Sequence, residues 1–244
     1  AFFENLYPNN LVQSKDKNVQ TILDWFSLQE EAKSIQTICH SCKVAKDYTI
    51  KNKKVTYRDS AIPQINSFSK FCKFFFWFLY RSTKALFSLH ERLLFRQLVY
   101  QKLVKISSKK ELYESYLFHN SGHLLRPLWT YEAEQKGSNI IFYFYSTNVS
   151  SFKVKHKSFI QDFQWQIVSW PNYWVWNKGQ VDFLKLNVIS PFKTMIKGVI
   201  PFSISNKAFD LSKFKKKPFI LIFEVQPVNE NFYTSLASSV DFYS

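Results

Sequence analysis

The chain has 244 residues, of which 46% are hydrophobic and 21% are charged, so a sizeable folded core is expected and intrinsic disorder is excluded. The 33 Lys and Arg outnumber the 18 Asp and Glu, which gives a formal net charge of +15. A positive field of this size attracts phosphate, whether on nucleic acid, anionic lipid or a sugar nucleotide. The longest apolar run, Phe74 to Tyr80, is far shorter than the ~20 residues that span a bilayer as a helix, so we expect no spanning segment.

The N-terminal part of the sequence is mixed and then helical. The stretch Val19 to Ala32 is compatible with a helix that has one broad apolar face. Asp47 to Asp59 is polar and charged, which indicates a loop or an exposed hairpin. From Ser67 to Ile106 no Pro or Gly interrupts a helical pattern, so we expect a helical N-terminal region.

Two interpretations apply to Lys70 to Arg81, which is apolar nearly all round and has basic ends. It could lie as an interfacial helix in the headgroups of an anionic membrane. It could instead be a buried helix of an aromatic-rich core, which is the interpretation we favour.

The clearest pattern runs from Glu111 to Ser146. Tyr113 to Phe118 predicts a strand, and His123 to Lys136 predicts a helix with an apolar stripe. Gly137 stands where the helix should end in a left-handed residue. Asn139 to Tyr145 predicts a strand buried on both faces. A strand, a helix and a strand in this order predict a right-handed βαβ unit.

Further strands and helices follow. The sequence predicts short strands at Trp165 to Val168 and Tyr173 to Trp176, a helix at Gln180 to Leu186, and strands at Thr194 to Ile200 and Phe219 to Val225. This alternation predicts an α/β fold with a Rossmann-like, doubly wound parallel sheet. We expect residues 1–204 to form the first domain, with the basic aromatic segment at 67–106. Residues 205–217 should form a linker, and residues 218–244 the start of a second Rossmann-like domain in a longer protein.

Candidate site residues follow the predicted strands, because ligands bind at the carboxyl ends of the strands of an open parallel sheet. His119 or His123 could act as the base on a sugar hydroxyl. The residues expected to bind substrate are Asn120, Ser121, Arg126, Ser146, Thr147 and Asn148. The alternative is that all of these are capping and loop residues.

Other patterns carry less chemistry. Three cysteines form no disulfide framework, which favours a reducing compartment, and Cys39 to Cys42 lacks a second ligand pair for zinc. The aromatic group from Trp165 to Trp176 is either a stacking platform or core. With 4 Gly there is neither a dinucleotide-binding glycine motif nor a P-loop.

Several short segments together resemble a known family. They are Tyr116 to Pro127, Thr130 to Asn148, Trp170 to Asn177, Lys197 to Phe202 and Phe219 to Val228, with Tyr233. Their succession is similar to that of bacterial surface-carbohydrate biosynthesis proteins with the GT-B glycosyltransferase architecture.

The resemblance implies two Rossmann-like domains with the active site between them. The first would bind a glycan or lipid-linked acceptor, and the second would bind a nucleotide sugar as co-substrate, with no bound metal or cofactor. We therefore expect a cytoplasmic protein, in peripheral contact with the inner face of the cytoplasmic membrane. The alternatives are a non-catalytic scaffold of the same pathway and a basic nucleic-acid-binding protein.

Overall fold

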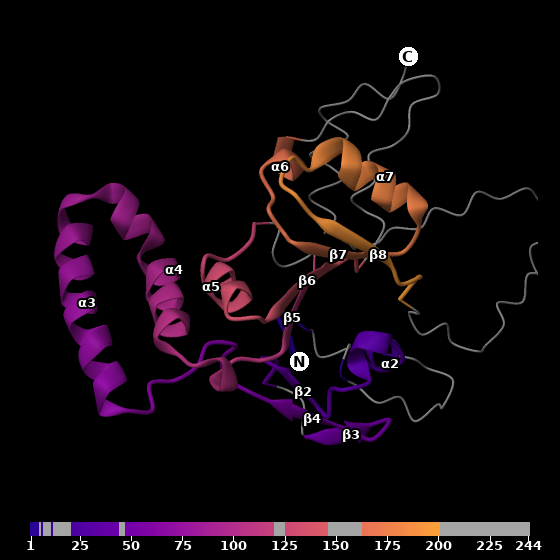
Figure 1. Ribbon diagram of the computed structural model, residues 1–244, viewed down its shortest axis with the longest axis horizontal. Coiled ribbons are helices and arrows are strands. Elements are labelled where there is room, and N and C mark those ends of the chain that lie inside the picture. Colours follow the sequence, from indigo (N-terminus) through magenta and orange to yellow (C-terminus); the bar gives the residue numbers. More distant parts are fainter. Residues whose placement is uncertain are drawn as a thin grey trace, which may run out of the picture. The chain divides into compact units, whose positions relative to one another are not determined.

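The computed structural model describes residues 1–4, 6, 11, 21–43, 47–119, 125–145 and 163–200, which belong to one compact unit (Figure 1). Its strands are β1 (Phe2–Phe3), β2 (Thr37–His40), β3 (Tyr48–Ile50), β4 (Lys53–Tyr57), β5 (Ser115–His119), β6 (Asn139–Tyr143), β7 (Asn172–Val175) and β8 (Lys193–Ile196). Its helices are α2 (Ile22–Ser27), α3 (Phe68–Phe87), α4 (Leu89–Ile106), α5 (Trp129–Gln135), α6 (Phe163–Gln166) and α7 (Lys178–Asn187), with 3-10 turns at Glu30–Ala32 and Lys109–Glu111.

The strands form one sheet in the order β3-β4-β2-β1-β5-β6-β7-β8. Every neighbouring pair is parallel except β3 and β4, which form an antiparallel hairpin. Apart from β3, the order is that of a doubly wound sheet, because the chain builds outward from β1 to β4 and then returns to β5 and continues to β8. The predicted α/β, Rossmann-like fold is confirmed, and the order reverses between β1 and β5.

The N-terminal part contributes more strands than the sequence indicates. β1 and β2 lie in the middle of the sheet, although their two and four residues are too short to show a period. Of the two alternatives for Asp47 to Asp59, the hairpin holds as β3 and β4, with Lys51 and Asn52 in its turn at φ of 44° and 66°. It is not exposed as predicted, because β4 pairs with β2 and Lys53, Val55 and Thr56 are buried. The predicted helix at Val19 to Ala32 is shorter, because α2 ends at Ser27.

Each face of the sheet carries its own apolar core. Neighbouring residues alternate between the faces, so that Phe2 packs with Tyr116 and Phe142 on one face and Phe3 packs with Leu117 and Tyr143 on the other. α5 and α7 contribute to the first core and α2 contributes to the second. The central strands are therefore buried on both sides.

The βαβ unit is confirmed, with different bounds. β5 and β6 are parallel, and Gly137 ends the intervening helix with φ of 86°. The helix begins at Trp129 and not at the predicted His123, and residues 120–124 lie outside the described residues. β6 ends at Tyr143.

The later elements follow the predictions with one correction. β7, α7 and β8 are present close to the predicted ranges. The strand predicted at Trp165 to Val168 is wrong, because Phe163–Gln166 is helical and stacks Trp165 on Phe144, with ring centroids 5.6 Å apart. The strand predicted from Phe219 and the predicted linker and second domain lie outside the described residues.

The long helical segment is a hairpin of two helices. Ser88 has extended backbone angles, and its Oγ accepts a hydrogen bond from the Glu91 amide while its own amide donates to the Lys84 carbonyl. Ser88 therefore ends α3 and begins α4 without Gly or Pro. α4 packs between α3 and α5 (Figure 1). No residue of α3 is buried, so the favoured prediction of a core helix for Lys70 to Arg81 is wrong.

Candidate functional site

Four adjacent strands end on polar side chains where the strand order reverses. β2 ends at His40, β5 at His119 and β6 at Tyr143, and Glu4 directly follows β1. In an open parallel sheet this carboxyl edge at the reversal is where ligands bind. We call these four residues the edge cluster.

Strand register puts three members of the edge cluster on one face of the sheet. His40 is opposite Phe3, and Phe3 is opposite Leu117, which is two residues before His119. His119 is in turn opposite Tyr143, with ring centroids 5.6 Å apart. Directly opposed residues point to the same face, so both histidines and the tyrosine share the face that α2 covers.

Several polar atoms of the edge cluster are buried without hydrogen bonds of normal geometry to the described residues. They are one carboxylate oxygen of Glu4, the hydroxyl of Tyr143 and both ring nitrogens of His40, although the His40 ring also lies close to the Cys42 backbone. Buried polar groups are nearly always satisfied in proteins, and an exception needs an explanation such as a functional role. The edge cluster therefore offers a donor and several acceptors to a ligand.

The charge states of these groups suit proton transfer. Burial raises the pKa of Glu4 to about 7, which leaves its carboxyl able to gain or lose a proton near neutral pH. Burial lowers the pKa of His40, so the neutral imidazole is favoured there. A carboxyl with a pKa near the working pH is well suited to general acid–base chemistry.

The structure places two of the eight sequence-predicted site residues. His119 is buried at the end of β5, in the edge cluster. Arg126 lies just before α5 and has little exposed side-chain surface. The others, Asn120, Ser121, His123, Ser146, Thr147 and Asn148, lie outside the described residues.

Arg126 uses its guanidinium within the chain. Nε donates to the Thr130 hydroxyl at 2.9 Å, and Nη1 donates to the Ser169 carbonyl at 3.1 Å. Nη2 pairs with Glu134, and the guanidinium lies 3.8 Å from the centroid of the Tyr131 ring. These contacts tie α5 to the loop before β7. A substrate role for Arg126 stays a prediction, and it would require the guanidinium to give up some of these contacts for contacts with the substrate.

Sequence reasoning missed Glu4, His40 and Tyr143. The only signal at Glu4 is an acid directly after two Phe residues, which is too short to be recognised as a strand. His40 lies between Cys39 and Cys42, whose spacing is typical of metal ligands and not of an acid–base histidine. Tyr143 belongs to an apolar run and looks like core in the sequence, but its hydroxyl is buried without a hydrogen-bond partner in the described part of the chain.

The helix that follows β1 is not arranged to bind phosphate. α2 has only six residues, and a capping box of Thr21 and Asp24 closes its N-terminus with a carboxylate. Within the described part of the chain, no group of three or more His, Cys, Asp or Glu could hold a metal ion.

A hollow of about 1130 Å³ lies beside β1, β2 and β4. The extended segment between β4 and α3 lines it together with the residues before β5. Its charged side chains have both signs, such as Arg58, Asp59, Lys110 and Glu111, so it does not select for an anion.

The predicted aromatic platform is largely core. Trp165, Trp170, Tyr173 and Trp174 are all buried, and only Trp176 is partly exposed. The stacking alternative is therefore wrong for these four residues, and the core alternative holds.

Comparison with known proteins identifies a family model. The model described as "Polysaccharide biosynthesis PFTS motif protein" matches residues 73–244, which is more than half of the chain. No curated protein and no solved structure matches the chain. Among the helices that the structure describes, none is long and apolar enough to cross a membrane.

Proposed function

Because the chain belongs to the polysaccharide biosynthesis PFTS motif protein family, we propose that it is the acceptor-binding part of a glycosyltransferase. The enzyme would transfer a sugar from a nucleotide sugar to a glycan or lipid-linked acceptor, in the cytoplasm. The observation that carries the proposal is the buried carboxyl of Glu4 at the reversal of strand order, where one of its oxygens has no hydrogen-bond partner among the described residues. Residues 1–204 contain no phosphate-binding glycine loop, which is compatible with a GT-B arrangement in which another domain binds the nucleotide sugar.

In this mechanism Glu4 acts as the general base. The acceptor hydroxyl attacks the anomeric carbon, its proton passes to the Glu4 carboxylate, and the bond from the sugar to the nucleoside diphosphate breaks. The bonding electrons leave with the diphosphate. His119, on the adjacent strand, is the alternative base.

The test is acceptor-dependent release of nucleoside diphosphate by the full-length protein, with a panel of nucleotide sugars. Glu4→Gln should lower kcat by about 10²- to 10⁴-fold, because a positioned base contributes that much to the rate. The wild-type kcat/KM should rise with pH through about 7, where the Glu4 carboxyl loses its proton.

Glu30→Gln is the matched control, since this carboxylate is exposed and pairs only with Lys33 among described residues. Its activity should equal that of the wild type. Full activity of Glu4→Gln together with a loss in His119→Gln would move the base to His119. No acceptor-dependent release from any donor would favour a non-catalytic scaffold.

A further inference from the structure

The end of the α3–α4 hairpin exposes large apolar side chains. Phe87 is 91% exposed and Leu93 is 74% exposed, and Leu86 and Leu89 beside them are also exposed. We call these four residues the hairpin tip. Contiguous exposed apolar side chains of this kind are typical of an interaction site.

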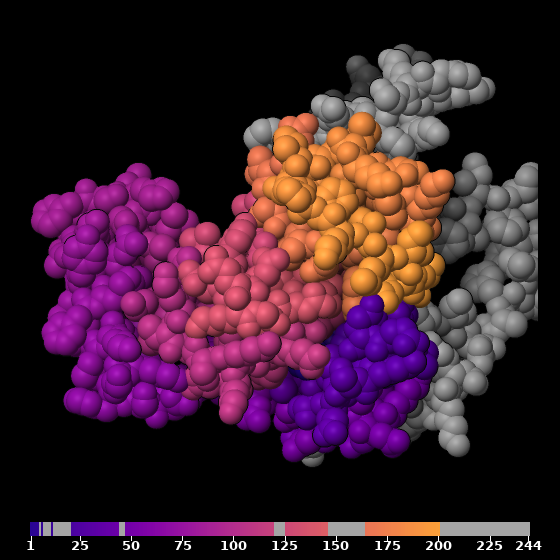
Figure 2. All heavy atoms as spheres, viewed as in Figure 1, coloured from indigo at the N-terminus to yellow at the C-terminus, as the bar shows by residue number. Residues whose placement is uncertain are grey.

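The apolar surface continues along α3. Phe68, Phe71, Phe75 and Leu79 recur every three or four residues and are all exposed, so they form one apolar stripe along α3. The inner face of α3 packs on α4, where Phe78 contacts Phe95 with ring centroids 5.4 Å apart. Figure 2 shows the side chains of this hairpin at the surface of the unit.

The hairpin is also strongly basic. Residues 68–106 contain eight Lys and Arg and one acidic residue, Glu91. Glu91 pairs with Arg81 between the two helices, which neutralises it. Lys73 and Lys84 are exposed on α3, and Arg92 lies beside Leu93 at the tip, where its guanidinium donates to the carbonyls of Ala85 and Leu86.

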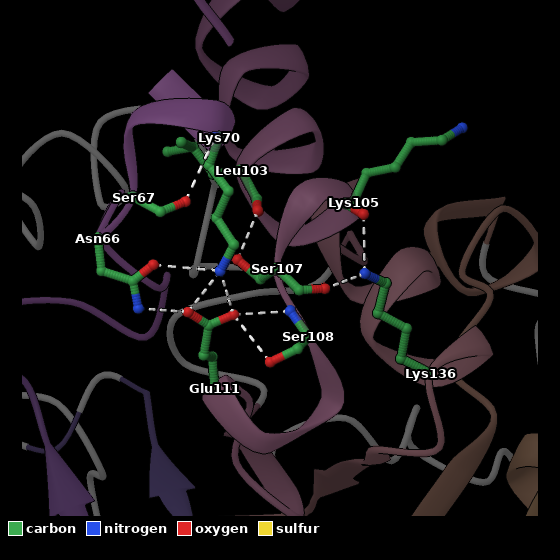
Figure 3. A network of polar contacts seen from close by, with 9 residues as sticks. All are labelled: Asn66, Ser67, Lys70, Leu103, Lys105, Ser107, Ser108, Glu111 and Lys136. Carbon is green, nitrogen blue, oxygen red and sulfur yellow. Dashed lines mark hydrogen bonds and ion pairs between the residues drawn. The ribbon is translucent and has the colours of Figure 1, made fainter. Parts of the chain in front are cut away.

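A polar network fixes the base of the hairpin (Figure 3). Lys70 donates to both carboxylate oxygens of Glu111 at 2.6 Å, and Asn66 donates to one of them. The ammonium of Lys70 lowers the pKa of Glu111 to about 2, so this carboxyl stays charged over the physiological range. At the other helix, Lys136 donates to the carbonyls of Lys105 and Ser107. The base is therefore tied to the 3-10 turn before β5 and to the end of α5, while the tip stays exposed.

We propose that the hairpin tip and the α3 stripe dock this protein on the surface of a bilayer that contains anionic lipid. Apolar side chains would enter the acyl boundary and the flanking Lys and Arg would contact the headgroup phosphates.

A second copy of the chain is a poorer occupant, because two surfaces with this excess of basic residues would repel each other. Single-stranded nucleic acid would use the aromatic rings and the charge, but it leaves the aliphatic Leu86, Leu89 and Leu93 without a role. Docking on a membrane requires no sugar-transfer activity, so it is tested independently of the proposed function.

The test is co-sedimentation of the full chain with vesicles of phosphatidylcholine alone or with about 30% phosphatidylglycerol. The wild type should bind the anionic vesicles at least about tenfold more tightly than the neutral ones, and binding should weaken when salt rises to about 1 M. The double variant Phe87→Ser, Leu93→Ser should lose at least about tenfold in affinity. The double variant Lys84→Gln, Arg92→Gln should lose mainly the preference for anionic vesicles.

Ile189→Ser is the matched control, because this side chain is 77% exposed in the described unit but is remote in sequence from the hairpin. It should bind like the wild type. Circular dichroism of each variant verifies that the fold is retained. The proposal is overturned if the wild type does not bind anionic vesicles, or if the tip variant binds them as well as Ile189→Ser does. It is also overturned if the tip variant loses only self-association in light scattering, or only binding to oligonucleotide.

Discussion

At the scale of single residues, Glu4 combines a cost in stability with a capacity for chemistry. Its carboxyl is buried, and burial raises its pKa to about 7 from an ordinary value of 4.5. Between these two pH values the folded chain binds more protons than the unfolded chain, so stability falls as pH rises through this window. A carboxylate kept in such a place is typical of a functional group, because structure alone gains nothing from it.

Replacing Glu4 should therefore stabilise the protein at high pH. The free energy of unfolding of Glu4→Gln should rise relative to the wild type by about 3 kcal/mol between pH 4 and pH 8, since each pH unit between the two pKa values corresponds to about 1.4 kcal/mol. Urea titrations at the two pH values measure this difference. An equal pH dependence of the two proteins would show that the carboxyl is solvated. Glu30→Gln should show no such rise, because the Glu30 carboxyl is exposed and Lys33 lowers its pKa.

At the scale of elements, the end of α5 depends on one glycine. Gly137 has φ of 86°, its amide donates to the Glu134 carbonyl, and the Ser138 amide donates to the Ala133 carbonyl. A side chain at this position would also meet the Lys109 ammonium, at 3.1 Å from an added Cβ. This left-handed turn directs the chain from α5 into β6.

Gly137→Ala should destabilise the protein by about 1 to 2 kcal/mol, because alanine resists a left-handed backbone. Thermal unfolding or urea titration measures the effect. Gly137→Asn should cost less, since asparagine tolerates the left-handed angles while placing its Cβ at the same point as alanine does. If the two variants were equally destabilised, contact with Lys109 would be the cause and not the backbone angle.

At the scale of the whole molecule, β1 joins the two halves of the sheet. Phe3 is fully buried, lies between β2 and β5, and contacts Phe26 at 4.9 Å and Tyr143 at 6.0 Å between ring centroids. Its removal should therefore affect strands on both sides. The exposed Phe87 has no such role in the core.

Phe3→Ala should cost about 3 to 5 kcal/mol, which is typical of a large cavity in a core. The loss should appear in a single unfolding transition, because both halves of the sheet pack on this side chain. Phe87→Ala should change stability by less than about 0.5 kcal/mol. Two separate transitions in Phe3→Ala would show instead that the halves fold independently.

The sequence alone determined the elements whose signals are local. The βαβ unit around Gly137 could be predicted because a buried strand, an amphipathic helix and a left-handed stop each leave a pattern within a few residues. The hairpin of β3 and β4 and the parallel α/β class followed from similar short-range patterns. His119 was predicted for the same reason, since it directly follows a clear apolar run.

Only the tertiary structure decided which residues are buried together. β1 has two residues and no period, and its central place depends on pairing with β2 and with β5, which is more than 100 residues away along the chain. The burial of Glu4 and His40 follows from that pairing, because desolvation comes from neighbours on other strands. The exposure of α3 also depends on tertiary packing. The composition of α3 suits a core helix and an interfacial helix equally. In the structure α4 packs on α5, and α3 packs on α4 with no residue buried.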